Sequence, residues 1–207
     1  MKKGMFIVVD GIDGSGKSEI IKMLHNHLFS KHKKHRILTT REPTNGSYGK
    51  QIRAMLKNEK NPESSSTKLM DLFIKDRQQH VKNTIEPFLK KSTSHELNIV
   101  LCDRYYYSTI AFQGAQGLNI KELIGKNKKF RKPDIAFILD VGPSVALERI
   151  KHRQKEKFEQ LEFMEKIRHN FLRLPKLLNE NIKIIDSSKP LKGVFEDVRI
   201  EVDRMLA

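Results

Sequence analysis

The chain has 207 residues, a length that suits one domain of ordinary size. With 38% hydrophobic residues, a net charge of +15 and a single cysteine, it is expected to be a globular cytoplasmic protein without a disulfide framework. The sequence contains no apolar run long enough to span a membrane, and the basic start at Met1 leads into a run too short for a signal peptide.

Apolar runs rich in β-branched residues alternate with stretches of helical periodicity along the whole chain. The runs predict strands over 5–9, 36–40, 97–102, 135–141 and 182–186. The periodic stretches predict helices over 17–31, 47–58, 67–91, 105–117, 143–152, 159–180 and 191–206. Pro87 is expected to end or kink the third of these helices. This alternation is typical of an α/β fold with a parallel sheet and helices on both faces, here as one domain over 1–207.

A glycine-rich loop joins the first predicted strand to the first predicted helix. Its spacing, Gly11-x-x-x-x-Gly16-Lys17-Ser18, is typical of a P-loop in this strand–loop–helix context. Backbone N–H groups and the helix N-terminus are then expected to bind phosphates, with Lys17 reaching the β- and γ-phosphates and Ser18 ligating Mg²⁺. A plain glycine turn is the alternative. The predicted phosphate cradle comprises Gly11, Ile12, Asp13, Gly14, Ser15, Gly16, Lys17 and Ser18.

Three basic clusters, 31–36, 126–132 and 149–157, carry much of the net charge. The first two precede predicted strands, so they are expected at the amino ends of the sheet, opposite the end where α/β sheets bind ligands. We interpret them as surface and helix-end charge, with a secondary anion or nucleic-acid patch as the alternative. The third cluster follows the fourth strand and a short helix, which predicts a position at the ligand-binding end.

Further candidate residues follow the second and third strands. Arg41 ends the second strand in "TREP". Phe73 and Arg77 lie four apart on one helix face and suit stacking on a base and donation to its carbonyl; a core phenylalanine beside a solvated arginine is the alternative. Asp103 ends a buried strand and is placed like an acid that holds Mg²⁺, with an N-cap role as the alternative.

The motifs "GIDGSGKS", "TREP", "LFIKDR", "DRYYYSTIAFQG", "KPDIAFILDV" and "ALERI" occur in an order that resembles the thymidylate kinase family and cover nearly the whole chain. The resemblance implies a P-loop NTPase-type five-stranded parallel sheet with a short lid. It also implies ATP with Mg²⁺ as phosphoryl donor, dTMP as acceptor, dTDP as product and a homodimer, with no need for nucleic acid or a membrane. The apolar face of 69–88 is a candidate dimer surface.

The resemblance implies roles for individual residues. Lys17, Asp103 and Arg104 belong to the catalytic set, and Ser18 and Asp103 to the metal site. The segment 186–190 lies where the family places adenine. The implied acceptor contacts are Arg41 and Arg104 for the phosphate, Phe73, Arg77, Ser108 and Gln113 for the base, and Asp13, Phe112 and Phe158 for the sugar.

A lid is expected at about 149–158. One branch of the family has a basic residue just after the P-loop aspartate, and another has glycine there and uses lid arginines instead. Gly14 occupies that position here, so the resemblance implies a catalytic arginine in the lid, Arg153 first and Arg149 second. Solvated helix charges are the alternative.

The chain departs from the family pattern at four places. The segment after "TREP" lacks the double glycine that is often found there. Asp10 stands where glutamate is common, and this shorter acid is expected to change little. Phe112 stands where tyrosine is common, and the lid lacks the Asp-Arg that usually precedes the aromatic at Phe158.

Two other functions stay open from the sequence. One is another P-loop nucleoside monophosphate or deoxynucleoside kinase with a pyrimidine acceptor. The other is a P-loop NTPase or nucleic-acid binder that uses the positive charge.

Overall fold

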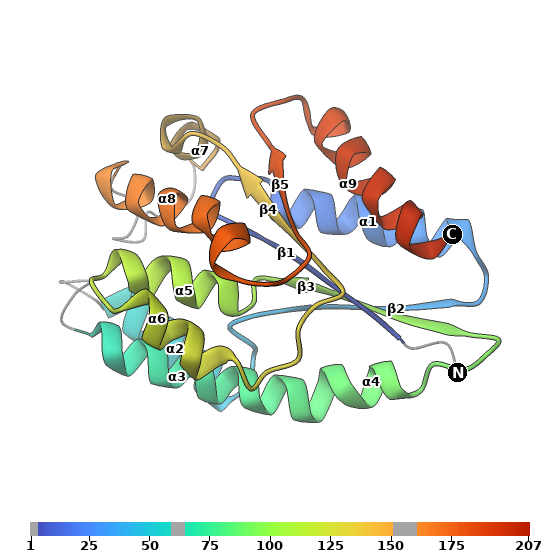
Figure 1. Cartoon of the computed structure of the whole chain (residues 1–207), viewed down its shortest axis with the longest axis horizontal. Helices are drawn as coiled ribbons and strands as arrows, with labels where there is room; N and C mark the ends of the chain where they lie inside the picture. The colour runs from blue at the N-terminus through green and yellow to red at the C-terminus, as the bar shows by residue number, and fades with distance from the viewer. Residues whose placement is uncertain (1–3, 59–64, 151–160) are drawn as a thin grey trace.

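The computed structural model describes residues 4–58, 65–150 and 161–207. Within them, one parallel sheet has the strand order β2-β3-β1-β4-β5 (Figure 1). Each predicted strand is present, and the predicted α/β class with a five-stranded parallel sheet is confirmed. The strands are β1 Met5–Gly11, β2 His35–Arg41, β3 Leu97–Asp103, β4 Ile135–Asp140 and β5 Ile182–Asp186.

Helices connect the strands as the periodicity predicts, with two differences. The described helices are α1 Lys17–Lys31, α2 Ser47–Asn58, α3 Ser66–His80, a π turn η1 Val81–Ile85, α4 Glu86–Lys90, α5 Tyr106–Ala115, α6 Ile120–Asn127, α7 Pro143–Arg149, α8 Leu161–Leu177 and α9 Leu191–Leu206. Helix α6 was not predicted, although Asn119 caps it by accepting the N–H groups of Lys121 and Glu122. The helix that contains Pro87 does not end there. It changes to the π turn just before the proline and continues to Lys90.

The central strands β1, β3 and β4 are buried on both faces of the sheet, which explains their apolar runs. Side chains of β1 alternate between the two sides, with Phe6 and Val8 in one core cluster and Ile7 and Val9 in the other. Helices α1 and α9 cover the second side, and α5 and α8 contribute to the first (Figure 1). The P-loop therefore leaves the sheet from a central, rigid strand.

Strand register brings the candidate site together at the carboxyl end of the sheet. Asp103 of β3 is level with Val9 of β1 and with Arg41 of β2. Gly11 is level with Leu139 of β4. The P-loop, "TREP" and the loop after β3 consequently emerge side by side.

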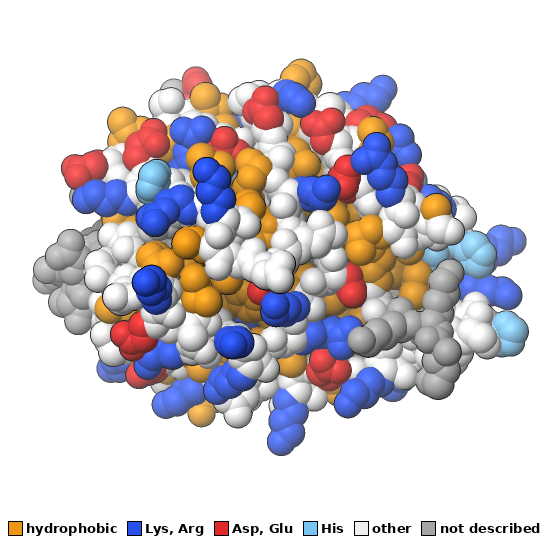
Figure 2. Space-filling model, viewed as in Figure 1, with side chains coloured by type: hydrophobic (Ala, Val, Ile, Leu, Met, Phe, Trp, Pro, Cys, Tyr) orange, Lys and Arg blue, Asp and Glu red, His pale blue; other side chains and the backbone are white. Residues whose placement is uncertain are grey.

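The first two basic clusters adjoin the amino ends of β2 and β4, as predicted. Some of their charges are paired there, including Lys31 with Asp203 at 2.6 Å and Arg36 with Glu96 at 2.7 Å. On the face shown in Figure 2, basic side chains are interspersed with acidic ones. Among the described helices, none is both long and apolar enough to cross a membrane.

Candidate active site

The glycines of the P-loop adopt backbone conformations that other residues rarely take. Gly14 has φ of +80°, and a Cβ at this position would collide with the carbonyl of Ala146 in α7. Gly16 has φ of +91° and directly precedes α1. The loop can therefore turn its backbone N–H groups inward above the helix N-terminus. The plain-turn alternative does not account for the buried lysine at its end.

Lys17 lies buried under the P-loop backbone. Its Nζ donates to the carbonyl of Ile12 at 2.7 Å and to that of Gly11 at 3.1 Å. Burial, followed by the nearby Arg104 charge, lowers the pKa of Lys17 from 10.5 to about 8. The Asp13 carboxylate lies 3.9 Å from this ammonium, and a bound polyphosphate would add further negative charge beside it.

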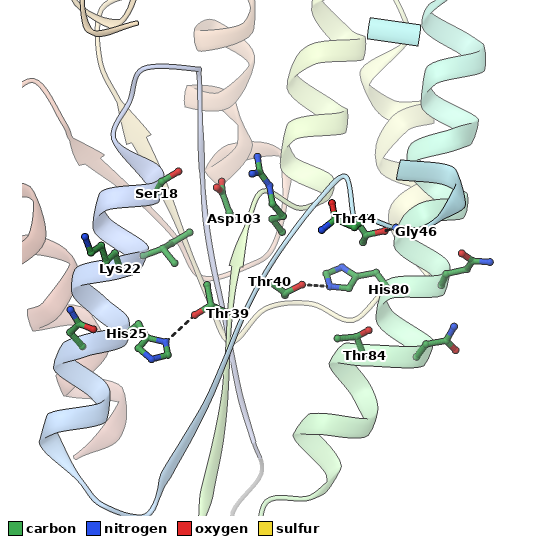
Figure 3. Close-up of a pocket in the computed structure, with 16 residues that line it drawn as sticks. Ser18, Lys22, His25, Thr39, Thr40, Thr44, Gly46, His80, Thr84 and Asp103 are labelled. Atoms are coloured by element: carbon green, nitrogen blue, oxygen red, sulfur yellow. Dashed lines mark hydrogen bonds between the residues drawn. The ribbon is translucent and has the colours of Figure 1, made fainter. Parts of the chain in front are cut away.

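Ser18 and Asp103 line the same cavity at the carboxyl ends of β1 and β3 (Figure 3). One carboxylate oxygen of Asp103 is buried and has no hydrogen-bond partner among the described residues. In the described parts of the chain, no group of three or more His, Cys, Asp and Glu side chains forms a metal site. These residues fit Mg²⁺, which binds through one or two protein ligands, waters and substrate phosphates.

Arg104 joins the P-loop to the segment after β3. It has a left-handed backbone with φ of +67°. Its Nη1 donates to the Gly11 carbonyl at 3.1 Å and to the Ser108 hydroxyl at 3.0 Å, and its Nη2 forms an ion pair with Asp13. Its guanidinium also lies 5.3 Å from the ring centroid of Phe112. This geometry places one arginine between the P-loop and a cavity that it also lines.

Asp10 is completely buried and holds the P-loop against the segment after β3. Its carboxylate accepts the backbone N–H groups of Gly11, Tyr105 and Ser108 at 2.8–3.1 Å and the Ser108 hydroxyl at 2.7 Å. Burial raises its pKa, although Arg104, the Ser108 hydroxyl and the Gly11 N–H oppose the shift. The carboxylate thus caps the start of α5 and ties it to the P-loop.

A cavity of about 410 Å³ opens beside Arg104 and contains most of the predicted acceptor residues. Of the nine predicted, eight line it: Asp13, Arg41, Phe73, Arg77, Arg104, Ser108, Phe112 and Gln113. The ninth, Phe158, lies outside the described residues. Residues that line the cavity but were not predicted include Glu42, Arg53, Leu56, Tyr105, Gln116 and Ile150.

Arg77 is not the solvated arginine of the alternative interpretation. It is 1% exposed and donates to Glu42, Asn127 and Thr109 at 2.6–3.0 Å. Phe73, four residues earlier, is partly buried against a small cluster that includes Leu69, and it also lines the cavity. The phenylalanine therefore combines a packing contact with a face toward the cavity.

The polar residues deeper in the cavity differ in what they offer a ligand. The Ser108 hydroxyl already donates to Asp10 and accepts from Arg104. The Gln113 amide nitrogen donates to Gln116 at 3.1 Å, whereas its buried carbonyl oxygen has no partner among the described residues. Gln113 thus combines a place in the cavity lining with an acceptor that has no partner among the described residues.

The described part of the expected lid consists of its first residues. Arg149 ends α7, where its Nη1 donates to the Ser187 carbonyl at 3.0 Å and lies 3.5 Å from the Gly14 carbonyl. It therefore links the P-loop to the predicted adenine segment after β5. Arg153 lies outside the described residues.

A second cavity of about 800 Å³ adjoins the first and shares Arg41 and Asn45 with it. It runs from Ser18 and Asp103 along the edge of β2 (Figure 3). Sequence reasoning did not predict it. Its lining depends on α1, β2 and α3 meeting in space, and no local motif marks such a meeting.

Sequence reasoning also missed two supporting side chains. Glu42 belongs to "TREP", but only the arginine of that motif was interpreted. Arg53 of α2 donates to the carbonyls of Pro43 and Thr44 at 3.0 and 2.6 Å and so holds the loop after β2. His80, three residues after Arg77, could also have indicated a supporting polar contact near that arginine.

The thymidylate kinase family model matches residues 9–198. The chain is 38% identical over 200 residues to a thymidylate kinase of Leptospira interrogans, covering 95% of this chain and 92% of that protein. It is 36% identical over 208 residues to a thymidylate kinase of Desulfotalea psychrophila, covering 98% and 96%. A probable thymidylate kinase of Archaeoglobus fulgidus is 35% identical over 204 residues, with the same coverage. The chain therefore belongs to the thymidylate kinase family and is a phosphotransferase of the nucleoside monophosphate kinase type.

Proposed function

We propose that this protein transfers the γ-phosphoryl group of Mg²⁺-bound ATP to dTMP, giving dTDP. The observation that carries the proposal is the position of Arg104, which contacts the P-loop and lines the acceptor cavity. The proposal treats the chain as one kinase domain with a lid at about 149–158. We also propose that it works as a homodimer in the cytoplasm.

The acceptor in this reaction is a phosphate oxygen that is already anionic, so no strong general base is needed. The protein must instead bring two polyanions together and neutralise the charge on the moving phosphoryl group. Lys17 and the P-loop N–H groups serve the donor, and Arg41 and Arg104 serve the acceptor phosphate. Ser18 and Asp103 would hold Mg²⁺, which neutralises charge on the phosphates when bound.

The cavity suits thymine through its pattern of donors and acceptors. Thymine presents an N3–H donor beside its O4 acceptor. The unpartnered carbonyl of Gln113 suits the N3–H, and the donor-only guanidinium of Arg77 suits O4. Phe73 and Phe112 both line the cavity; Phe73 would supply an apolar face for stacking, and Phe112 would pack near the sugar. The thymine methyl is worth only about 1–3 kcal/mol in such a pocket, so some activity on dUMP is expected.

The apolar face of 69–88, the candidate dimer surface, is only partly accessible to a partner chain. Leu69, Leu72 and Ile85 are buried within their own chain, and the exposed positions between them are mainly polar. Phe73, Val81 and Phe88 on this face are half-buried and stay candidates for the dimer surface. Sedimentation at micromolar concentration tests the homodimer. A monomer mass would contradict the dimer.

A panel of acceptors tests the proposed function. We expect ADP release with ATP, Mg²⁺ and dTMP to exceed that with dUMP, dCMP, dGMP and AMP, and to be unaffected by added DNA. Preference for another pyrimidine monophosphate would favour a related kinase. ATP hydrolysis that depends on DNA would favour a nucleic-acid-dependent NTPase instead.

A further inference from the structure

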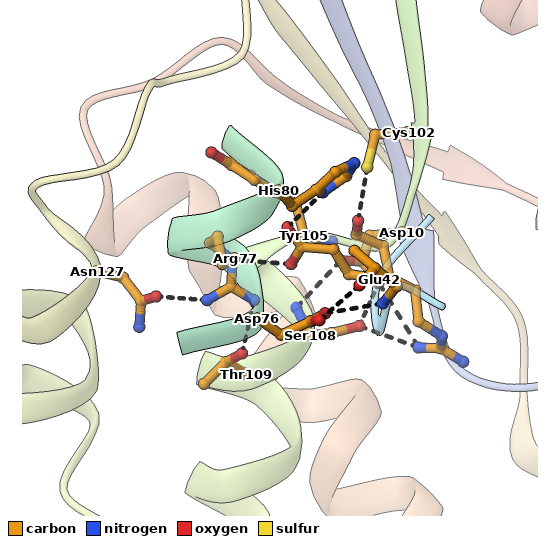
Figure 4. A network of polar contacts seen from close by, with 12 residues as sticks. Asp10, Glu42, Asp76, Arg77, His80, Cys102, Tyr105, Ser108, Thr109 and Asn127 are labelled. Atoms are coloured by element: carbon orange, nitrogen blue, oxygen red, sulfur yellow. Dashed lines mark hydrogen bonds and ion pairs between the residues drawn. The ribbon is translucent and has the colours of Figure 1, made fainter. Parts of the chain in front are cut away.

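A chain of buried polar side chains reaches Arg77 from the edge strand β2. His80 of α3 contacts the Thr40 hydroxyl through Nε2 at 2.8 Å and the Glu42 carboxylate through Nδ1 at 3.0 Å. The other oxygen of Glu42 accepts the Nε–H of Arg77 at 2.8 Å. Figure 4 shows Glu42 between the histidine ring and the guanidinium. Arg77, Glu42 and His80 are 1%, 2% and 4% exposed.

Burial makes this geometry restrictive. A buried guanidinium without a counter-ion is costly, so Arg77 and Glu42 must stay together. The guanidinium is also held on its other side by Asn127 at 2.6 Å and Thr109 at 3.0 Å. Asp76, the acid next to Arg77 in sequence, accepts the N–H and hydroxyl of Thr44 instead. Glu42 is thus the carboxylate paired with Arg77 in this part of the chain.

The histidine completes the hydrogen bonding of Glu42. An ionised carboxylate only accepts, so the Nδ1 of His80 must be the donor in this contact. The Thr40 hydroxyl can donate to Nε2 or accept from it, and so it orients the ring in either protonation state. His80 therefore fixes the rotamer of Glu42, and Glu42 fixes the plane of Arg77.

We propose that Glu42 and His80 are positioning residues that set the selectivity of the acceptor site for pyrimidines with a carbonyl at C4. This inference rests on the proposed function, because it requires that Arg77 faces the C4 substituent. A guanidinium held in place donates a hydrogen bond to a carbonyl at C4. Cytosine carries an amino group at C4, which is itself a donor, so it cannot accept this hydrogen bond. If the guanidinium could turn away, cytosine would lose this penalty and thymine would lose a hydrogen bond.

Two amide substitutions at His80 separate the contacts of the ring. In His80→Asn the amide nitrogen falls near Nδ1 and keeps a donor for Glu42. In His80→Gln the amide falls near Nε2 and keeps the contact with Thr40 instead. Glu42→Gln keeps the volume of Glu42 but removes its charge. The measurement is the ratio of the Kd of dCMP to the Kd of dTMP by titration calorimetry, with the Kd of ATP and the unfolding temperature as controls.

We expect the ratio to fall at least about tenfold in His80→Gln and in Glu42→Gln, and to stay within about threefold of wild type in His80→Asn. The Kd of ATP should not change. Equal ratios in both amide variants, or an unchanged ratio in Glu42→Gln, would overturn the proposal and leave a purely structural role. If one variant fails to fold, the remaining variants still test the proposal. A wild-type protein that discriminates between the two monophosphates but transfers no phosphoryl group to dTMP would contradict the proposed function and not this inference.

Discussion

The carboxylate of Asp10 accepts the backbone N–H of Ser108 at 3.0 Å, across 98 residues of chain. Each of its oxygens accepts two hydrogen bonds, and together they hold the start of α5 against the P-loop. Arg104 lies between the two attachment points. The position of this arginine therefore depends on a side chain that need not touch a substrate.

We predict that Asp10→Asn destabilises the protein and weakens binding of dTMP. An amide nitrogen would replace one accepting oxygen and face buried N–H donors, which costs about 1–3 kcal/mol. Urea unfolding measures the loss, and the KM for dTMP should rise with it. The control is Asp197→Asn, which breaks an exposed pair with Lys189 and should leave stability nearly unchanged. Equal stability of the two variants would contradict the role of Asp10.

Phe73→Ala is expected to raise the KM for dTMP more than the KM for ATP. Stacking of a base on an aromatic side chain is worth roughly 1–3 kcal/mol, so the KM for dTMP should rise about tenfold. The matched control is Leu69→Ala, which lies fully buried in the same apolar cluster but does not line the cavity. It should lower the free energy of unfolding by about 2–5 kcal/mol and leave both KM values unchanged. Parallel increases in both KM values for Phe73→Ala would show that Phe73 is only a core residue.

Binding of ATP should be accompanied by proton uptake at Lys17. The pKa of this buried lysine is about 8 in the free protein, and a bound polyphosphate raises it. At about pH 8 roughly half of the lysine lacks its proton, so uptake of about 0.5 proton per site is expected, falling toward zero at about pH 6. Calorimetry in buffers with different ionisation enthalpies measures this number. Absence of uptake at about pH 8 would mean that the lysine is already fully charged.

The lowered pKa of Lys17 also makes the stability of the protein depend on pH. Because the pKa of Lys17 is lowered on folding, the unfolded chain binds more protons between about pH 8 and 10.5. The contribution of this group to the free energy of unfolding therefore rises with pH across that window. Lys17→Met should lose this part of the pH dependence.

We predict that an arginine of the lid, Arg153 or Arg149, stabilises the transferring phosphoryl group. An arginine at a transferring phosphoryl group is worth roughly 10³–10⁵ in kcat in related reactions. We expect Arg153→Ala to lower kcat more than Arg149→Ala does, because Arg149 is engaged by the Ser187 carbonyl near the P-loop. A double variant that kept more than about a fifth of the wild-type kcat would lose under about 1 kcal/mol of barrier stabilisation, too little for this role.

The strands and the P-loop could be predicted because each has a strong local pattern. Strands buried on both faces read as continuous apolar runs, and the loop has a fixed spacing between a strand and a helix. The acceptor residues could be located because their motifs follow strands whose carboxyl ends meet at one edge. Eight of them line one cavity.

The missed features depend on contacts that no local pattern encodes. Glu42 meets Arg77 and His80 from 35 and 38 residues away, and the periodicity of a helix does not reveal which partner balances a buried charge. Helix α6 has only eight residues and contains Gly125, so its helical periodicity is weak despite the Asn119 cap. The π turn at Val81–Ile85 precedes Pro87, where local rules favour a helix end.

The most direct test follows the label from ATP that carries it in the γ-phosphate, with dTMP and Mg²⁺ present. We predict that the label moves into dTDP, one for each ADP formed, and far faster than into an equal concentration of AMP or GMP. Label that appeared only in inorganic phosphate, or that moved to AMP and GMP as readily as to dTMP, would contradict it.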